Sequence, residues 1–174
     1  MHLFLDVIVT IVSVITVFTY TWSLRGHFSS PEMPSGAKVI SLVVIATAVV
    51  FTWLIWSREA PLPAMLVGLA LELAAYALFW WAILASRKAR LRFAFDPEGP
   101  RGLVTTGPYR YLRHPFYTSY LIFRSGWAIA SGVVWSAIPV ALFIVIYILA
   151  ARREERLFSA SDMAGDYARY KRRT

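Results

Sequence analysis

The chain has 174 residues, of which 58% are hydrophobic and 16% aromatic, and its mean hydropathy is +0.56. A soluble domain of this size cannot bury so much apolar surface, so the composition excludes a soluble globular protein and predicts an integral membrane protein. The formal net charge is +8 with no cysteine, which excludes disulfides, thiolate nucleophiles and thiolate metal sites, and no metal site is expected.

Five apolar segments are predicted to cross the bilayer as α-helices, which takes about 20 residues each. They cover residues 3–24, 37–57, 62–86, 116–130 and 133–151. The first segment has no basic N-terminal region and no cleavage site, so it is predicted to be a retained helix. The fourth is short, which indicates a helix that is tilted or that enters from a loop in the headgroup layer. Ser131 and Gly132 separate the last two, which predicts a helical pair joined by a tight turn.

The sequence thus predicts an all-α integral membrane protein with a single domain over residues 1–174. A loop is expected over residues 87–115 and a tail over residues 152–174. Sixteen of the eighteen Lys and Arg residues fall in the loop, in the tail and in residues 25–38. Basic residues beside spans stay in the cytoplasm, so the N-terminus is expected outside and the C-terminus inside. The short, Arg-rich, cysteine-free chain is expected in a bacterial inner membrane. Because these residues adjoin the spans, they argue against binding to nucleic acid.

The predicted loop contains the sequence GPYRYLRHPFY over residues 107–117. Pro115 keeps the preceding residue extended, so Arg113 and His114 are expected just before a new helix. Backbone amides at that helix start, together with both side chains, would bind an anion. Anchoring to lipid headgroups is an equally good interpretation, and it is the preferred one for the basic run over residues 87–92.

Two adjacent carboxylates, Glu154 and Glu155, follow the last apolar segment. A helical pair over residues 116–151 returns the chain to the same membrane face, so these carboxylates are expected beside Arg113 and His114. A solvated cluster that pairs with neighbouring arginines is the alternative.

Tyr167 and Tyr170 lie three residues apart in a basic amphipathic tail. They are expected either to cover the site as a lid or to anchor the tail at the membrane interface.

Two ionisable residues, Glu72 and Arg124, lie within predicted spans. Charges inside a membrane are costly and are usually paired or functional. The two residues are therefore expected either to form a structural salt bridge with each other or to contact a substrate.

The combination of the GPYRYLRHPFY loop, Glu154-Glu155, Gly165, Tyr167 and Tyr170 resembles the isoprenylcysteine carboxyl methyltransferase family. That superfamily also takes in phospholipid methyltransferases. The resemblance covers about 75 residues at the C-terminal end, while the first three segments are similar in hydropathy only.

The resemblance implies a pocket for S-adenosylmethionine on the cytoplasmic face and a lipophilic acceptor that enters from the bilayer. The implied cofactor contacts are Tyr109, Arg113, His114, Pro115, Tyr117, Glu154, Glu155, Tyr167 and Tyr170. The residues expected to be catalytic are Arg113, which would orient an acceptor carboxylate, and Glu154 or Glu155, which would take the proton of an acceptor amine. The expected partners are the acceptor and membrane lipids, without an obligatory protein partner.

Two other functions fit parts of the pattern. A membrane reductase related to the sterol reductases would bind NADPH at a similar Arg-His-Pro loop, but it would need a larger basic cleft and usually a longer chain. The chain could also be a non-catalytic membrane scaffold. In that case the proximity of the loop to the two carboxylates would have no functional reason.

Overall fold

The computed structural model describes residues 2–26, 35–87, 89 and 102–174. Its helices are α1 (His2–Gly26), α2 (Ser35–Ser57), α3 (Leu62–Ser86), α4 (Pro115–Ala130), α5 (Ala137–Ser159) and α6 (Ala164–Lys171), with short 3₁₀ helices η1 (Gly107–Arg110) and η2 (Val134–Ser136). The described residues contain helices and no strand, which confirms the all-α prediction. The basic run over residues 87–92 falls mostly outside the described residues.

Four helical stretches of the described residues are long and apolar enough to cross a membrane: His2–Leu24, Lys38–Ser57, Leu62–Ser86 and Val134–Ser159. The segment predicted over residues 116–130 forms α4, which has 16 residues. At 1.5 Å per residue α4 is about 24 Å long, which is less than the roughly 30 Å of a hydrocarbon core.

Helix α5 continues to Ser159, eight residues beyond the end predicted at residue 151. The polar residues that follow the apolar part are mostly strong helix formers, so the helix does not end where the hydropathy falls. Glu154 and Glu155 therefore lie on the same rigid helix as the membrane-embedded part of α5.

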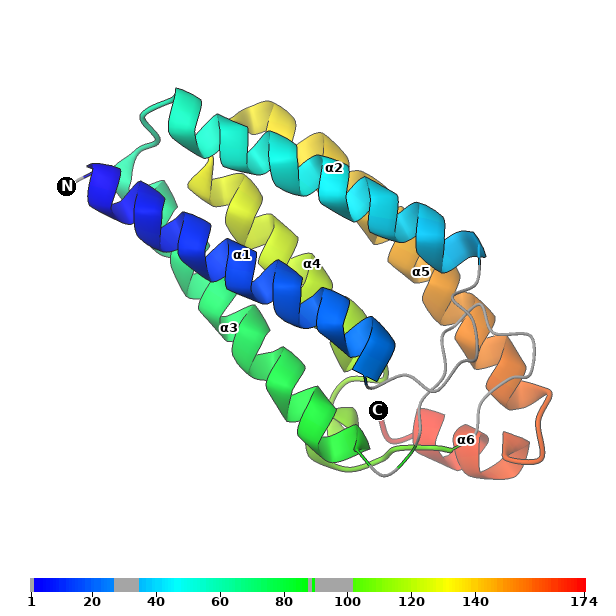
Figure 1. Ribbon diagram of the computed structural model, residues 1–174. Coiled ribbons are helices and arrows are strands. Elements are labelled where there is room, and N and C mark those ends of the chain that lie inside the picture. The colour runs from blue at the N-terminus through cyan, green and yellow to red at the C-terminus, as the bar shows by residue number, and fades with distance from the viewer. Residues whose placement is uncertain (1, 27–34, 88, 90–101) are drawn as a thin grey trace.

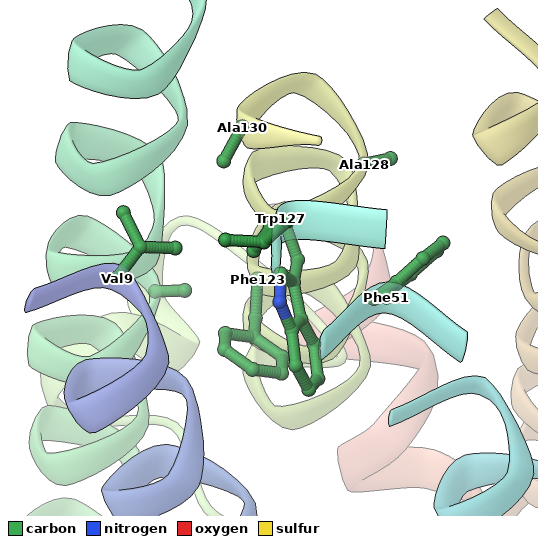
Figure 2. Close-up of a cluster of buried hydrophobic side chains, with 8 residues drawn as sticks. Val9, Phe51, Phe123, Trp127, Ala128 and Ala130 are labelled. Carbon is green, nitrogen blue, oxygen red and sulfur yellow. The ribbon is translucent and has the colours of Figure 1, made fainter. Parts of the chain in front are cut away.

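Helix α4 is the interior helix of the bundle, with α1 and α3 on one side and α2 and α5 on the other (Figure 1). Nine of its sixteen residues are buried, so it is covered by protein over most of its surface. Phe123 and Trp127 of α4 pack against Phe51 of α2 and Val9 of α1 (Figure 2). The ring centroids of Phe51 and Trp127 are 5.5 Å apart. A short helix that contacts protein on most sides can carry polar residues that a lipid-facing helix could not.

Helices α3 and α4 cross at two glycines. A Cβ atom on Gly68 would lie 2.5 Å from the carbonyl oxygen of Gly126, and a Cβ atom on Gly126 would lie 2.7 Å from the carbonyl oxygen of Gly68. Small residues that let two backbones touch are a common means of helix association in membranes. This contact fixes α4, and the loop that precedes it, against α3.

A tight turn follows α4 at Ser131 and Gly132. Gly132 has a φ of 64°, a conformation that favours glycine. The Ser131 hydroxyl donates to the carbonyl oxygen of Ala128 at 2.6 Å, and the Ser136 hydroxyl donates to the same oxygen at 3.0 Å. Beyond this turn α5 runs back along the bundle, so its last turns approach the start of α4 (Figure 1).

Candidate functional site

Three segments that are distant in sequence meet at one end of the bundle. They are the loop before α4, the last turns of α5, and α6 (Figure 1). Tyr170 of α6 donates a hydrogen bond to the carbonyl oxygen of Tyr109 in η1 at 2.8 Å. This bond holds the tail of the chain against the loop, so α6 forms one side of the site.

Five charged or titratable side chains form the centre of this site: Arg113, His114, Glu154, Glu155 and Lys171, called the charge cluster below. The Glu155 carboxylate receives Arg113 Nη1 at 2.6 Å on Oε1 and Lys171 Nζ at 2.8 Å on Oε2. The His114 ring bridges both acids, with Nδ1 at 3.3 Å from Glu154 Oε2 and Nε2 at 3.4 Å from Glu155 Oε1. The residues that the sequence predicts to meet across about forty positions are therefore in direct contact.

The start of α4 positions Arg113 and His114. Pro115 is at the first turn of the helix and His114 is its N-cap, as the sequence predicts. The loop reaches this point through Gly107, which has a φ of 60°. A Cβ atom there would lie 2.7 Å from the Cβ atom of Ala85, so the loop lies directly on α3.

The environment of His114 favours its charged form. Burial of the ring lowers its pKa, but hydrogen bonds and the charges of Glu154 and Glu155 outweigh burial, and the net effect raises the pKa above its usual value. The imidazolium is thereby stabilised between two carboxylates, and it holds both of them in place.

Aromatic rings line the cluster on two sides. On the membrane side, the Tyr117 ring stacks on His114 at 5.5 Å and on Tyr147 of α5 at 5.4 Å, with interplanar angles of 17° and 11°. On the tail side, Tyr167 stacks on Phe158 at 4.9 Å. Planar apolar faces beside charges suit a ligand with both an aromatic ring and charged groups.

Tyr167 and Tyr170 are 4% and 8% exposed, so α6 packs these rings inward. Burial raises the pKa of the Tyr167 hydroxyl to about 12, so this hydroxyl stays protonated well above neutral pH. The sequence predicts that these two tyrosines either cover the site as a lid or anchor the tail at the membrane interface. In the structure their rings pack against the loop and α5.

Of the two alternatives expected for Glu72 and Arg124, a mutual salt bridge or a substrate contact, the structure excludes the salt bridge. Glu72 is fully buried and accepts a hydrogen bond from the Ser13 hydroxyl of α1 at 2.9 Å. Arg124 Nη1 donates to the Thr47 hydroxyl of α2 at 3.1 Å, and its guanidinium lies 3.6 Å from the centroid of the Phe143 ring of α5. The two side chains face different neighbouring helices, so neither neutralises the other, and neither belongs to the charge cluster.

Two residues of the site were not predicted from the sequence. Lys171 reads as one of many basic residues of the tail, and Tyr147 as one of many aromatic residues in a span. A signal for Tyr147 exists, because it precedes Glu154 by seven residues and thus lies on the same face of α5. Lys171 follows Tyr170 directly, and no comparable spacing links it to Glu155.

The fold and the site define a class, an all-α membrane protein with a charged and aromatic site at one end of its bundle. Residues 63–161 match the phospholipid methyltransferase family. This match covers more than half of the chain, and the chain belongs to that family, whose members are membrane methyltransferases that act on lipid-type substrates. Neither the curated proteins nor the solved structures contain a match. The matched region runs from α3 to just beyond α5 and includes every member of the charge cluster except Lys171.

Proposed function

We propose that this protein transfers a methyl group from S-adenosylmethionine to a lipophilic acceptor, and that the charge cluster binds the cofactor. The observation that carries the proposal is the contact of Arg113 and His114 with Glu154 and Glu155 inside the region that matches a methyltransferase family.

The chemistry of the cluster fits this cofactor. S-adenosylmethionine has a carboxylate, an ammonium, a ribose diol and an adenine ring, and it supplies a methyl group on a sulfonium when bound. Arg113 suits the carboxylate, because its guanidinium can form two parallel hydrogen bonds. Glu154 or Glu155 suits the ammonium or the ribose hydroxyls. Tyr109, Tyr117, Tyr167 and Tyr170 supply the apolar wall that the adenine requires, and Pro115 fixes the loop that holds Arg113 and His114.

The pairing of Arg113 with Glu155 favours a ligand that carries both signs of charge. Each member of the pair is partly exposed, 32% for the Arg113 side chain and 19% for the Glu155 side chain. A zwitterion can replace each partner by a group of the same sign, so neither residue is left unpaired when the pair opens. A ligand with one sign of charge would replace only one member of the pair, and the other member would lose the contact that it makes there.

Positioning and exclusion of water are the main contributions expected from the protein, because methyl transfer is a direct displacement that needs no covalent enzyme intermediate. For an isoprenoid-like or other carboxylate acceptor, Arg113 would orient the attacking oxygen. For a lipid amine, Glu154 or Glu155 would accept the proton that the amine loses. The distribution of basic residues supports a cytoplasmic position of the site, with the N-terminus outside.

Transfer of radioactive methyl groups tests the proposal. Purified protein in lipid nanodiscs receives S-adenosylmethionine labelled on the methyl group, and a lipid extract is analysed for label. We expect label in the lipid fraction with the wild type and with Glu59→Gln, an isosteric change of an exposed carboxylate, and at least roughly a hundredfold less with Glu155→Gln, because a charged positioning contact is removed.

Equal labelling by Glu155→Gln and Glu59→Gln would contradict the assignment of the site. A folded wild type that transfers no label but binds NADPH would support the reductase, and one that binds neither cofactor would support the scaffold.

A further inference from the structure

Arg124 carries a charge inside the bundle at a distance from the charge cluster. It is 4% exposed and lies on the interior helix α4, two helical turns beyond Tyr117, or about 10 Å along the helix axis. A buried cation within the thickness of a membrane is costly unless an anion neutralises it.

No carboxylate provides that neutralisation among the residues that the structure describes. The guanidinium donates to the Thr47 hydroxyl at 3.1 Å and lies 3.6 Å from the centroid of the Phe143 ring. It also interacts electrostatically with three tyrosines, Tyr147, Tyr20 and Tyr120. Its Nε atom is buried and has no hydrogen-bond partner in the described part of the chain. A guanidinium has five N–H donors, so the side chain retains both its charge and donor capacity for a ligand.

Tyr147 connects Arg124 to the charge cluster. Its ring stacks on Tyr117 at 5.4 Å, and the Tyr117 ring stacks on His114 at 5.5 Å. The same tyrosine thus contacts the aromatic wall of the proposed cofactor site and the buried cation. An acceptor whose reactive group faces the cluster would therefore have to extend about 10 Å further along α4 to bring another of its groups to Arg124.

Two helices that contact Arg124, α2 and α5, have apolar outer faces. Thr47 lies on α2, the most peripheral of the four candidate spans, in which 11% of the most apolar stretch is buried, against 28% in each of the other three. The outer faces of α2 and α5 expose apolar side chains, among them Val49 and Ile148. An amphiphile can therefore keep its tail in the bilayer while its polar group lies against Arg124.

We propose that Arg124 binds an oxyanion, a carboxylate or a phosphate, of the lipophilic acceptor and thereby selects acidic amphiphiles. This inference rests on the proposed function, because it assigns the acceptor of that reaction. Arg124 is then a specificity-determining residue, and Tyr147 links its position to that of the cofactor site. A bound oxyanion would neutralise the positive charge of Arg124, which no carboxylate among the described residues does.

Binding of matched amphiphiles to protein in phosphatidylcholine nanodiscs tests the inference. Radiolabelled oleate is compared with its uncharged methyl ester, and phosphatidate with diacylglycerol, so that the two arms distinguish a carboxylate from a phosphate. The variants are Arg124→Gln, Arg124→Lys and, as a control, Arg58→Gln, which removes an exposed charge just beyond the end of α2.

In at least one arm, we expect the wild type and Arg58→Gln to bind the charged amphiphile at least roughly tenfold more tightly than its neutral counterpart, the effect of a charged hydrogen bond. Arg124→Gln loses this preference and Arg124→Lys keeps part of it. Equal affinity of the wild type for charged and neutral amphiphiles in both arms overturns the inference, whether or not the variants fold. So does a preference that survives in Arg124→Gln.

Binding of S-adenosylhomocysteine separates this test from that of the proposed function. We expect folded Arg124→Gln to bind it as the wild type does, because Arg124 is not in the charge cluster. A wild type that prefers acidic amphiphiles but does not bind S-adenosylhomocysteine would refute the proposed function, and a wild type that binds S-adenosylhomocysteine without the preference would refute only the assignment of Arg124.

Discussion

The ion pair between Arg113 and Glu155 should stabilise the fold measurably, and its strength can be worked out from the geometry. At an effective dielectric constant of about 20, two unit charges about 4 Å apart attract each other by about 4 kcal/mol. Loss of hydration and of side-chain freedom offsets most of this, and a charged hydrogen bond contributes about 1.5–3 kcal/mol net. Because both side chains keep contact with solvent, we expect a value near the lower end, about 1.5 kcal/mol.

The pair between Lys171 and Glu155 provides an internal comparison. Its distance of 2.8 Å is similar, but the Lys171 side chain is 50% exposed. Exposed pairs of this kind contribute less than about 1 kcal/mol. The structure thus predicts that Glu155 couples more strongly to the loop than to the tail.

Two double-mutant cycles measure these couplings in the absence of ligand. One combines Arg113→Gln with Glu155→Gln, and the other combines Lys171→Gln with Glu155→Gln. The free energy of unfolding is obtained from reversible denaturation by dodecyl sulfate in mixed micelles. A coupling of Glu155 to Arg113 that is zero, or no larger than its coupling to Lys171, would refute the reasoning.

Three further outcomes follow from single contacts. Gly126→Ala should destabilise the protein by about 2 kcal/mol or more, because the added methyl group collides with the backbone at Gly68, and the same denaturation assay measures this loss. Because the pKa of His114 is raised in the folded protein, its contribution to stability should be complete below its unfolded pKa of about 6.5 and should disappear as the pH rises through the folded pKa; His114→Gln should abolish this part of the pH dependence. Tyr170→Phe should cost about 1 kcal/mol through loss of the hydrogen bond to the carbonyl oxygen of Tyr109, and limited proteolysis should then cut the loop faster than in the wild type.

Spacing and topology were sufficient to predict the centre of the site. Pro115 indicated where α4 begins, and the return of the chain after Gly132 required Glu154 and Glu155 to approach Arg113 and His114. These inferences depend only on which end of a helix a residue occupies. The all-α class was predicted from the hydrophobic composition and the length of the apolar segments.

The alternative that the structure excludes, the salt bridge, depended on directions around a helix. Glu72 and Arg124 were expected at similar depths, but their pairing depends on which neighbour each side chain faces. In a helix that is apolar on all sides, the hydrophobic pattern does not reveal this direction. The close contact of Gly68 with Gly126 fixes the rotation of α3 against α4, and it places Glu72 beside α1 and Arg124 beside α2 and α5.

The most direct test of the central claim is calorimetric binding of S-adenosylhomocysteine to the purified protein, for the wild type, Arg113→Gln, Glu155→Gln and the control Glu59→Gln. The account predicts saturable binding by the wild type and by Glu59→Gln, with affinity at least roughly tenfold weaker in each of the other two variants, since each loses a charged contact. Unchanged affinity in both Arg113→Gln and Glu155→Gln, or no binding by a folded wild type, would contradict it.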